Sequence, residues 1–138
     1  MKVLSWQARR FGWTPHSRTL PLPLADETAS SHLVEEAVVA FLHVESGDEV
    51  QRSRVFRHVL KHLKWLANKR GMRTVVLHSF AHLGGDNSDP AFARDLLREL
   101  AERLERTGYQ VHCTPFGWFC AWELSVYGDS LAKVWKQV

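Results

Sequence analysis

Hydrophobic positions along the chain alternate between strand-like runs and helix-like spacing, which predicts interleaved strands and helices. Residues 37–44 and 74–80 form almost unbroken apolar runs, which are typical of strands buried on both faces of a sheet. Between them, apolar side chains recur at helical spacing over residues 55–67, and Gly71 supplies a helix stop. A strand, a crossover helix and a second strand place the two strands parallel, with a right-handed connection. The pattern therefore predicts the centre of an α/β sheet.

The second half of the chain predicts another helix and two outer strands. Asp89 supplies an N-cap and Pro90 a first-turn proline for a helix whose apolar stripe continues towards Thr107. Alternating apolar positions then predict strands over residues 109–113 and 118–126, separated by a turn. Together with the central unit, these elements predict an α/β fold with a mixed sheet and two long helices.

The two ends of the chain and one internal segment carry weaker patterns. Residues 2–6 predict a short first strand, with residues 7–13 as its hairpin partner. Residues 14–32 are rich in Pro, Ser and Thr and predict a long loop that is either mobile or functional. Near the C-terminus, Asp129 or Ser130 predicts the cap of a short terminal helix.

Composition restricts the class of protein. With 45% hydrophobic and 24% charged residues among 138, the chain has the balance of one folded domain. No apolar run approaches the ~20 residues needed to cross a bilayer, and the apolar stretch at the N-terminus is too short for a signal peptide. We therefore expect a cytoplasmic protein without a membrane partner. The two cysteines, Cys113 and Cys120, fit reduced thiols and are too few for a zinc ribbon.

Positive charge is concentrated in one predicted helix. The net charge is only +3, yet seven Lys or Arg residues lie from Gln51 to Arg70 with no Asp or Glu among them. The helix that begins near Pro90 instead pairs opposite charges four residues apart. Two interpretations of the basic helix stay open. It is either an ordinary solvated face or a face that follows phosphates and binds nucleic acid in a salt-dependent way.

Short motifs exclude several enzyme classes and leave one edge of the sheet as a candidate site. The chain has no phosphate-binding loop, no dinucleotide fingerprint and no Gly-x-Ser-x-Gly elbow. His43, His78 and His82 raise a zinc alternative, but residues four apart on a strand lie ~13 Å apart, so we expect no metal site. His82 follows the end of a central strand, where parallel sheets bind ligands, and the aromatic turn 115–119 suits base stacking. This combination is compatible with recognition of an RNA end, and a turn that belongs to the core is the alternative.

Five stretches of the chain resemble the N-terminal editing domain of archaeal-type threonyl-tRNA synthetases, a family that shares its fold with D-aminoacyl-tRNA deacylases. They are residues 1–4, 39–45, 79–83, 115–119 and 128–132, and their order and spacing match across residues 1–138. The resemblance implies a single domain with the D-aminoacyl-tRNA deacylase-like fold. It also implies a hydrolase without a cofactor that removes serine from mischarged threonine tRNA, and a homodimer. A second hydrolytic site is reasonable because small side chains are hard to separate by binding alone.

The resemblance also assigns residues to a binding site at the strand ends. In the family, the aminoacyl-adenosine end of tRNA lies there, and backbone groups hold the amino acid. The 2′-hydroxyl of the terminal adenosine helps to position the attacking water. By position, the residues of the aminoacyl pocket are Val44, Phe80, Ala81 and His82. The residues that approach the adenine are Phe116, Gly117, Trp118 and Phe119.

The chain departs from the family's pattern at three positions. A lysine that assists catalysis is replaced by Cys120, a glutamate of the C-terminal segment by Lys133, and a histidine of the first strand by Gln7. A thiol carries no fixed positive charge, so one hypothesis is that Lys133 returns that charge from the other side of the pocket. A second hypothesis makes Cys120 a nucleophile with His82 as its partner, and a small core residue is the ordinary alternative. The candidate catalytic residues are His82, Cys120 and Lys133.

Several functions stay open at this point. The leading hypothesis is an ester hydrolase that acts on mischarged tRNA, either in trans or as an excised part of a threonyl-tRNA synthetase. Action in trans is one expectation, because no synthetase catalytic or anticodon-binding portion is present in the sequence, and an excised domain fits equally well. A related deacylase for D-aminoacyl-tRNA is the alternative enzyme. The replaced lysine favours a degenerate module that binds a tRNA end or a nucleotide without hydrolysis, and a structural partner is the remaining option.

Overall fold

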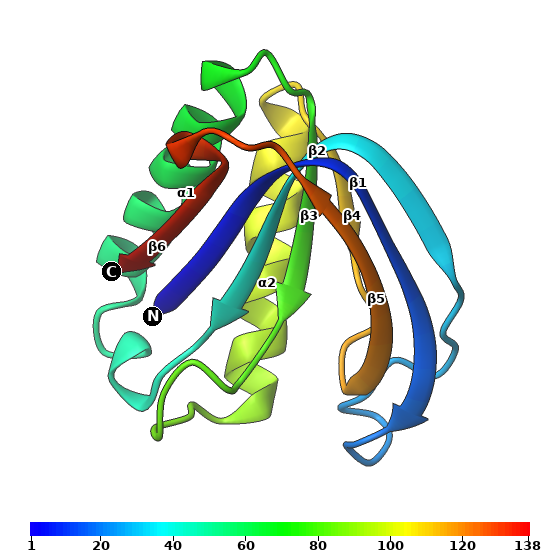
Figure 1. The fold of residues 1–138 in the computed structure, drawn as a ribbon. Coiled ribbons are helices and arrows are strands. Elements are labelled where there is room, and N and C mark those ends of the chain that lie inside the picture. Colours follow the sequence, from blue (N-terminus) through cyan, green and yellow to red (C-terminus); the bar gives the residue numbers. More distant parts are fainter.

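Six strands and two long helices form the fold in the computed structural model, which describes residues 1–138 (Figure 1). The strands are β1 (Lys2–Arg18), β2 (His32–His43), β3 (Thr74–Ser79), β4 (Gln110–Cys113), β5 (Trp118–Val126) and β6 (Lys133–Gln137). The helices are α1 (Arg52–Lys69) and α2 (Pro90–Arg106). Two single turns of 3-10 helix cover Ser46–Asp48 and Ser130–Ala132. The predicted mixed sheet with two long helices is confirmed.

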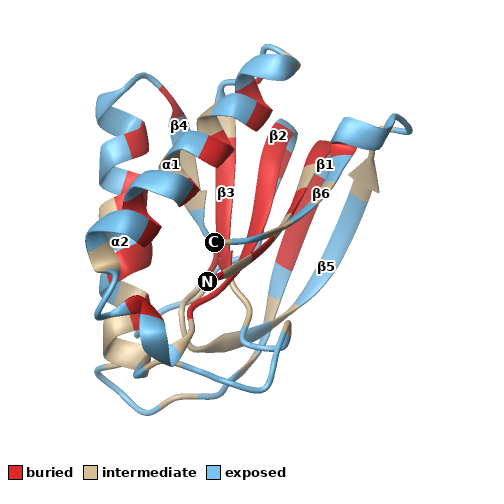
Figure 2. Cartoon of the chain, turned by 90° about the vertical axis from the view of Figure 1, so that its left-hand side faces the viewer, coloured by how far each residue is buried: buried red, intermediate tan, exposed pale blue.

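The strands form one sheet in the order β4-β3-β2-β1-β5, and β6 pairs with β1. β2, β3 and β4 run parallel, whereas β1 is antiparallel to β2, β5 and β6. The predicted strand–helix–strand unit is confirmed, because α1 connects β2 to its parallel neighbour β3. Both helices cover the same face of the sheet and turn their buried positions towards it (Figure 2). The opposite face is left to aromatic side chains.

Local sequence explains where the helices begin and end. The carboxylate of Asp89 accepts a hydrogen bond from the backbone N–H of Ala91 at 2.9 Å, and Pro90 occupies the first turn of α2, as predicted. Gly71 and Gly108 follow the two helices with positive φ angles of 66° and 99°, which glycine adopts without strain. Neither α1 nor α2 has the length and apolar character that a membrane-spanning helix requires.

β1 is a single strand of 17 residues, so the predicted hairpin over residues 2–6 and 7–13 is wrong. A hairpin requires a turn, but Gln7 and Ala8 are buried and continue the ladder with β2. The predicted loop over residues 14–32 is correspondingly shorter, because β1 continues to Arg18 and β2 begins at His32. Local patterns missed this strand because its partners lie far away in the sequence.

The predicted terminal helix is also wrong. Only Ser130–Ala132 form a helical turn, and the side chain of Asp129 makes no capping hydrogen bond. The chain then enters β6, where Val134 packs against the core and pairs with Ser5 of β1. The edge of β1 offers a full row of backbone partners to this segment, which outweighs the local capping preference.

β1 and β2 bend together at Arg9 and Glu36. Neither residue belongs to the ladder between the two strands, and Glu36 has a φ of 50°, a conformation that residues with a side chain seldom adopt. The hydroxyl of Tyr127 donates to both carboxylate oxygens of Glu36, at 2.6 and 2.8 Å. The guanidinium of Arg9 lies 5.1 Å from the centre of the Tyr127 ring. These contacts hold the bend from the β5 side.

The bend folds one half of the sheet across the open face of the other half. Phe41 lies opposite Leu4 of β1, whereas Trp122 of β5 lies opposite Trp13. In a flat sheet these positions would be about 30 Å apart along the strand direction. The ring centroids of Phe41 and Trp122 are only 4.7 Å apart. The β1–β5 half therefore arches over the aromatic face, which the ribbon shows as the curved blue and orange strands (Figure 1).

The start of β1 is tied to the segment after β2 by buried charges. The amino group of Met1 is fully buried and lies 2.7 Å from Asp48 Oδ1 and 2.9 Å from Glu45 Oε1. Lys2 also pairs with Glu45. Burial by itself raises the pKa of Glu45, but hydrogen bonds from Lys2, Gln137 and the amino group together lower it to about 2. The carboxylate stays ionised at neutral pH and fixes the end of β2.

A pH effect on stability follows from His62, which is buried between α1 and β1 at 3.2 Å from Ser5 Oγ. Burial, with the nearby charge of Lys136, lowers its pKa from 6.5 to about 4. Below pH 6.5 the unfolded chain binds a proton that the folded chain does not, so stability is lost as pH falls from 6.5 towards 4. We predict a loss of roughly 1–2 kcal/mol from this residue between pH 7 and pH 5.

Urea unfolding at both pH values measures this loss. The His62→Gln variant should show a smaller drop than the unmodified chain. His58→Gln, at an exposed position of the same helix, is the matched control and should show the full drop. Equal drops in both variants would contradict the assignment.

Candidate functional site

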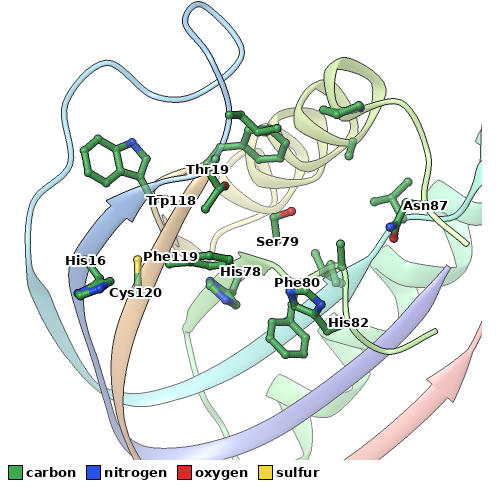
Figure 3. Close-up of a pocket in the computed structure, with 18 of the residues that line it drawn as sticks. His16, Thr19, His78, Ser79, Phe80, His82, Asn87, Trp118, Phe119 and Cys120 are labelled. Atoms are coloured by element: carbon green, nitrogen blue, oxygen red, sulfur yellow. The ribbon is translucent and has the colours of Figure 1, made fainter. Parts of the chain in front are cut away.

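A cavity of about 600 Å³ opens at the carboxyl ends of β2 and β3 (Figure 3). The start of α2, the first half of β5 and the loop after β1 form its other walls. The residues around it are mostly aromatic or small, and none is Lys, Arg, Asp or Glu. Three histidines and Cys120 are therefore its only titratable side chains.

The structure brings most of the predicted site residues to this cavity. Nine of the ten residues line it: Val44, Phe80, Ala81, His82, Phe116, Gly117, Trp118, Phe119 and Cys120. They come from three separate parts of the chain, and the bend in β1 and β2 brings the β5 residues to the ends of the parallel strands. The tenth residue, Lys133, is not among the lining residues.

Lys133 and Gln7 lie away from the cavity. Lys133 begins β6 opposite Trp6, and its ammonium donates a hydrogen bond to the backbone oxygen of Tyr127 at 2.9 Å. The expected return of a positive charge to the pocket is therefore not supported, because β6 pairs with the first third of β1 and the cavity touches only its last residues. Gln7 is buried on the helix side, where its amide donates to the backbone oxygen of Leu66 at 2.8 Å.

Cys120 and His82 form no pair. No hydrogen bond joins them, and in Figure 3 they enter the cavity from opposite walls, Cys120 from β5 and His82 from the loop after β3. Burial raises the pKa of the Cys120 thiol, so it stays protonated at neutral pH. His82 is exposed and lies edge-on against Phe80, with ring centroids 5.2 Å apart. The arrangement does not provide the activated thiolate that nucleophilic attack requires.

His78 lies on the cavity wall beneath the aromatic rings of Phe41, Phe80 and Trp122. It is 4% exposed, and its Nδ1 lies 2.7 Å from Thr114 Oγ1. Burial lowers its pKa to about 4, so the ring is neutral at pH 7. Its Nε2 has no hydrogen-bond partner in the chain. Every fully enclosed side-chain nitrogen or oxygen of the structure does have a partner, so Nε2 is not fully enclosed. Nε2 is therefore open to the cavity.

His43 holds the loop that closes the cavity after β3. The backbone N–H of Leu83 donates to His43 Nδ1 at 3.1 Å, so the ring proton is on Nε2. Nε2 then donates to the backbone oxygen of Asp86 and to Asn87 Oδ1, both at 2.7 Å. Both ring nitrogens are thus used within the protein, and His43 has a structural role. No group of three side chains in the structure is arranged to hold a metal ion.

Asp26 joins the loop after β1 to the turn before β5. Its carboxylate accepts from the backbone N–H of Phe116 at 2.9 Å, and its backbone oxygen accepts from the Trp118 indole N–H at 2.8 Å. The backbone N–H of Asp26 in turn donates to the oxygen of Phe116 at 2.9 Å. This part of the predicted loop is therefore anchored, and it fixes the Trp118 ring at the cavity.

Gly117 allows the close contact between this turn and the loop. It has a φ of 77°, and a Cβ at this position would lie 2.7 Å from Ala25 Cβ and 2.8 Å from Ala25 Cα. Glycine is therefore required both by its backbone conformation and by the space available. The resemblance placed Gly117 near the adenine, and the structure adds this reason for a glycine.

Sequence reasoning missed the wall formed by the loop after β1 and the place of His78 in the cavity. His16, Thr19 and Leu20 line the cavity, and Asp26 organises its wall. Nothing local in residues 14–32 distinguishes them from an ordinary loop. His78 was considered only as a metal ligand. Its position two residues before Phe80 puts it on the same face of β3, which could have indicated a place in the cavity.

The sequence model of one protein family, the archaea-specific editing domain of threonyl-tRNA synthetase, matches residues 1–138. The chain belongs to this family. Threonine–tRNA ligases are among the similar proteins. That of Thermococcus kodakarensis is 30% identical over 118 residues, which is 86% of this chain and 19% of the relative. That of Staphylothermus marinus is 29% identical, over 100% of this chain and 22% of the relative. The editing domain thus spans about a fifth of the length of the curated relatives it matches.

A solved structure shares the fold of the editing domain. It is described as a c-Myc DNA unwinding element binding protein, with a TM-score of 0.62 and 13% sequence identity. The match covers 100% of this chain and 99% of that one. This likeness concerns the fold alone, and it confirms the D-aminoacyl-tRNA deacylase-like architecture that the resemblance implied.

The Asp26 contacts predict how the cavity wall of the editing domain responds to mutation. Asp26→Ala removes the acceptor for the Phe116 N–H and should cost about 1 kcal/mol of unfolding free energy. The loop over residues 19–31 should also become more sensitive to limited proteolysis. Asp26→Asn keeps an acceptor oxygen and is the matched control, with a smaller change in both measurements. Identical protease sensitivity of Asp26→Ala and the unmodified chain would rule out the anchoring role.

Proposed function

We propose that this editing domain hydrolyses the ester between a mis-attached amino acid and the terminal adenosine of tRNA, with serine on threonine tRNA as the substrate. The observation that carries the proposal is the cavity of about 600 Å³ at the ends of β2 and β3, lined by aromatic and small side chains. Its volume is within the range of sites that enclose a small organic ligand. Membership of the editing-domain family supports a role in tRNA editing.

The two kinds of lining residue suit the two parts of an aminoacyl-adenosine. Phe116, Trp118 and Phe119 offer ring faces for the adenine, and the hydrogen bond from Trp118 to Asp26 holds its ring in place before binding. Val44 and Ala81 line the cavity directly after β2 and β3, where we place the small amino acid. Serine and threonine differ by one methyl group, which a binding pocket separates by about 10–200-fold, so a second hydrolytic site has a purpose.

The chemistry in this proposal uses neutral groups. The cavity is lined by no lysine, arginine or carboxylate that could act on the ester. His78 holds the attacking water through Nε2, the ring nitrogen open to the cavity, and Thr114 fixes the ring from behind. The 2′-hydroxyl of the adenosine, which the family resemblance assigns to water positioning, completes the arrangement. Cys120 contributes its shape at the wall and no charge.

The proposal includes partners. The domain acts on the 3′ end of tRNA, either in trans or as a part of a threonyl-tRNA synthetase. Two copies of the chain pair as a homodimer through aromatic side chains left open on the strands. Trp135 of β6 is 56% exposed and Trp122 of β5 is 45% exposed, and such side chains are enriched at protein interfaces.

A binding module without hydrolysis is the second candidate function. The observation in its favour is the same lack of any fixed cation around the cavity, because such a cation would stabilise the charge that develops during ester hydrolysis. A module of this kind would hold a tRNA end or a nucleotide on the aromatic wall. A D-aminoacyl-tRNA deacylase is the alternative enzyme, since the two families share the fold.

A deacylation panel separates these functions. The purified chain is incubated with seryl-, threonyl- and D-aminoacyl-tRNA, and ester loss is followed over time. We expect seryl-tRNA(Thr) to be hydrolysed about 10–100 times faster than threonyl-tRNA(Thr). Preferential loss of the D-aminoacyl ester would reassign the enzyme. Binding of the tRNAs without any ester loss would select the binding module.

Replacement of His78 tests its role in hydrolysis. His78→Phe keeps an aromatic ring in the aromatic cluster but removes the nitrogen that faces the cavity. We expect kcat to fall by about 10²–10³ with little change in KM, because the substrate still binds. His62→Gln, a buried histidine replaced on the opposite face of the sheet, is the control at pH 7.5. A folded His78→Phe variant with full turnover would exclude the role.

A further inference from the structure

We infer that the exposed side of α1 is an RNA-binding surface, which holds backbone phosphates of the tRNA body while the tRNA 3′ end occupies the cavity. The choice of tRNA as the ligand rests on the proposed function. The surface is named the α1 basic face, and its residues are Arg54, Arg57, Lys61, Lys64, Trp65 and Lys69.

The cations of the α1 basic face have no anionic partner within the chain. The only ion pairs of this segment lie at the ends of the helix, where Arg52 pairs with Glu99 and Arg70 pairs with Asp129. α1 itself contains no Asp or Glu. α2 shows the ordinary arrangement, with Glu and Arg spaced four residues apart on its solvent side. Five cations on one side of the helix without an anionic partner therefore indicate an external anion.

Part of the α1 basic face forms a row suited to binding the phosphate backbone of a nucleic acid. Arg54, Lys61, Trp65 and Lys69 fall on one exposed stripe of the helix, and the row spans about 22 Å at 1.5 Å per residue. Trp65 is 42% exposed, although it lies among cations. A ring face beside a line of positive charges is the combination that binds nucleic acids, since phosphates contact the cations and a base or ribose contacts the ring.

The position of the α1 basic face allows one RNA to reach it and the cavity together. Val44, at the end of β2, lines the cavity, and the chain enters α1 a short distance later at Arg52. The start of α1 therefore lies at the cavity end of the sheet, and the helix runs back along β2 from there (Figure 1). An RNA whose end is in the cavity meets the first turns of α1 and continues along the helix.

An anionic membrane fits the surface less well. A helix that binds a lipid surface inserts apolar side chains beneath its cations. The apolar side chains of α1 are instead buried against the sheet: Val55, Phe56, Val59, Leu63, Leu66 and Ala67. Trp65 alone remains on the exposed side. Nucleic acid is therefore the partner that the charges favour.

A charge-matched pair of triple variants tests the inference. The first is Arg57→Gln/Lys61→Gln/Lys69→Gln on the α1 basic face. The second, Arg10→Gln/Arg73→Gln/Arg106→Gln, removes the same charge from exposed positions elsewhere. tRNA affinity is measured at several salt concentrations between about 50 and 200 mM. We expect the first variant to bind about 10–1,000-fold more weakly at low salt, with a salt slope smaller by about 1 for each phosphate that it no longer binds.

Comparison of two substrates distinguishes this inference from the proposed function. The α1 variant should show a raised KM for full-length seryl-tRNA but unchanged hydrolysis of seryl-adenosine, which is too small to reach α1. Loss of tRNA binding in the α1 variant, with no hydrolysis of either substrate by any form of the chain, would sustain the RNA surface and reject the proposed enzyme. Equal tRNA binding by the two triple variants would overturn the inference. So would α1-dependent binding to phosphatidylserine vesicles that tRNA does not displace.

Discussion

The shared bend of β1 and β2 at Arg9 and Glu36 is the constraint on which the site depends. Without it, the aromatic residues of β5 would lie about 30 Å from the ends of the parallel strands. The left-handed backbone at Glu36 is costly for a residue with a side chain. The hydrogen bonds of Tyr127 to the Glu36 carboxylate and the Arg9 guanidinium above the ring offset part of that cost.

The two faces of the sheet have separate tasks. The helix side carries the aliphatic core and the polar contacts that fasten α1 to β1, including Gln7 with Leu66 and Ser5 with His62. The aromatic side is unprotected by helices, so the bent β1–β5 half covers it and leaves the cavity at its rim. The helix side holds the larger core, and the aromatic side combines a smaller core with the cavity. The α1 basic face adds charge on the outside of the stable layer.

Local patterns were sufficient for the centre of the fold but not for its margins. The strands over residues 37–44 and 74–80 and both long helices follow from apolar spacing and from caps such as Asp89, because their stability depends on nearby residues. β6 depends on a partner more than a hundred residues away, as in the pairing of Lys2 with Gln137, and β1 needs the distant β5 and β6 as well as the nearer β2. A sequence window cannot contain such a pairing, and the weak local preferences there suggested a hairpin and a helix instead.

The candidate site was likewise predictable from the sequence only in part. Family resemblance located the aromatic and small residues of the cavity, because these are set by short stretches with recognisable order. The behaviour of titratable groups depends on packing, which the sequence does not reveal. His43 became a structural clasp, His78 a neutral cavity residue, and Cys120 a protonated thiol across from His82. The placement of Lys133 followed from β6, which local reasoning had assigned to a helix.

The hydrogen bonds between Asp26 and Phe116 join segments that are far apart in the sequence, which bears on the order of folding. The two residues are separated by 90 positions, whereas the core of β2, α1 and β3 is built from neighbours in the chain. Contacts between distant segments carry a larger loop-closure cost and form late. We therefore expect the cavity wall at Phe116 to form after the core of β2, α1 and β3.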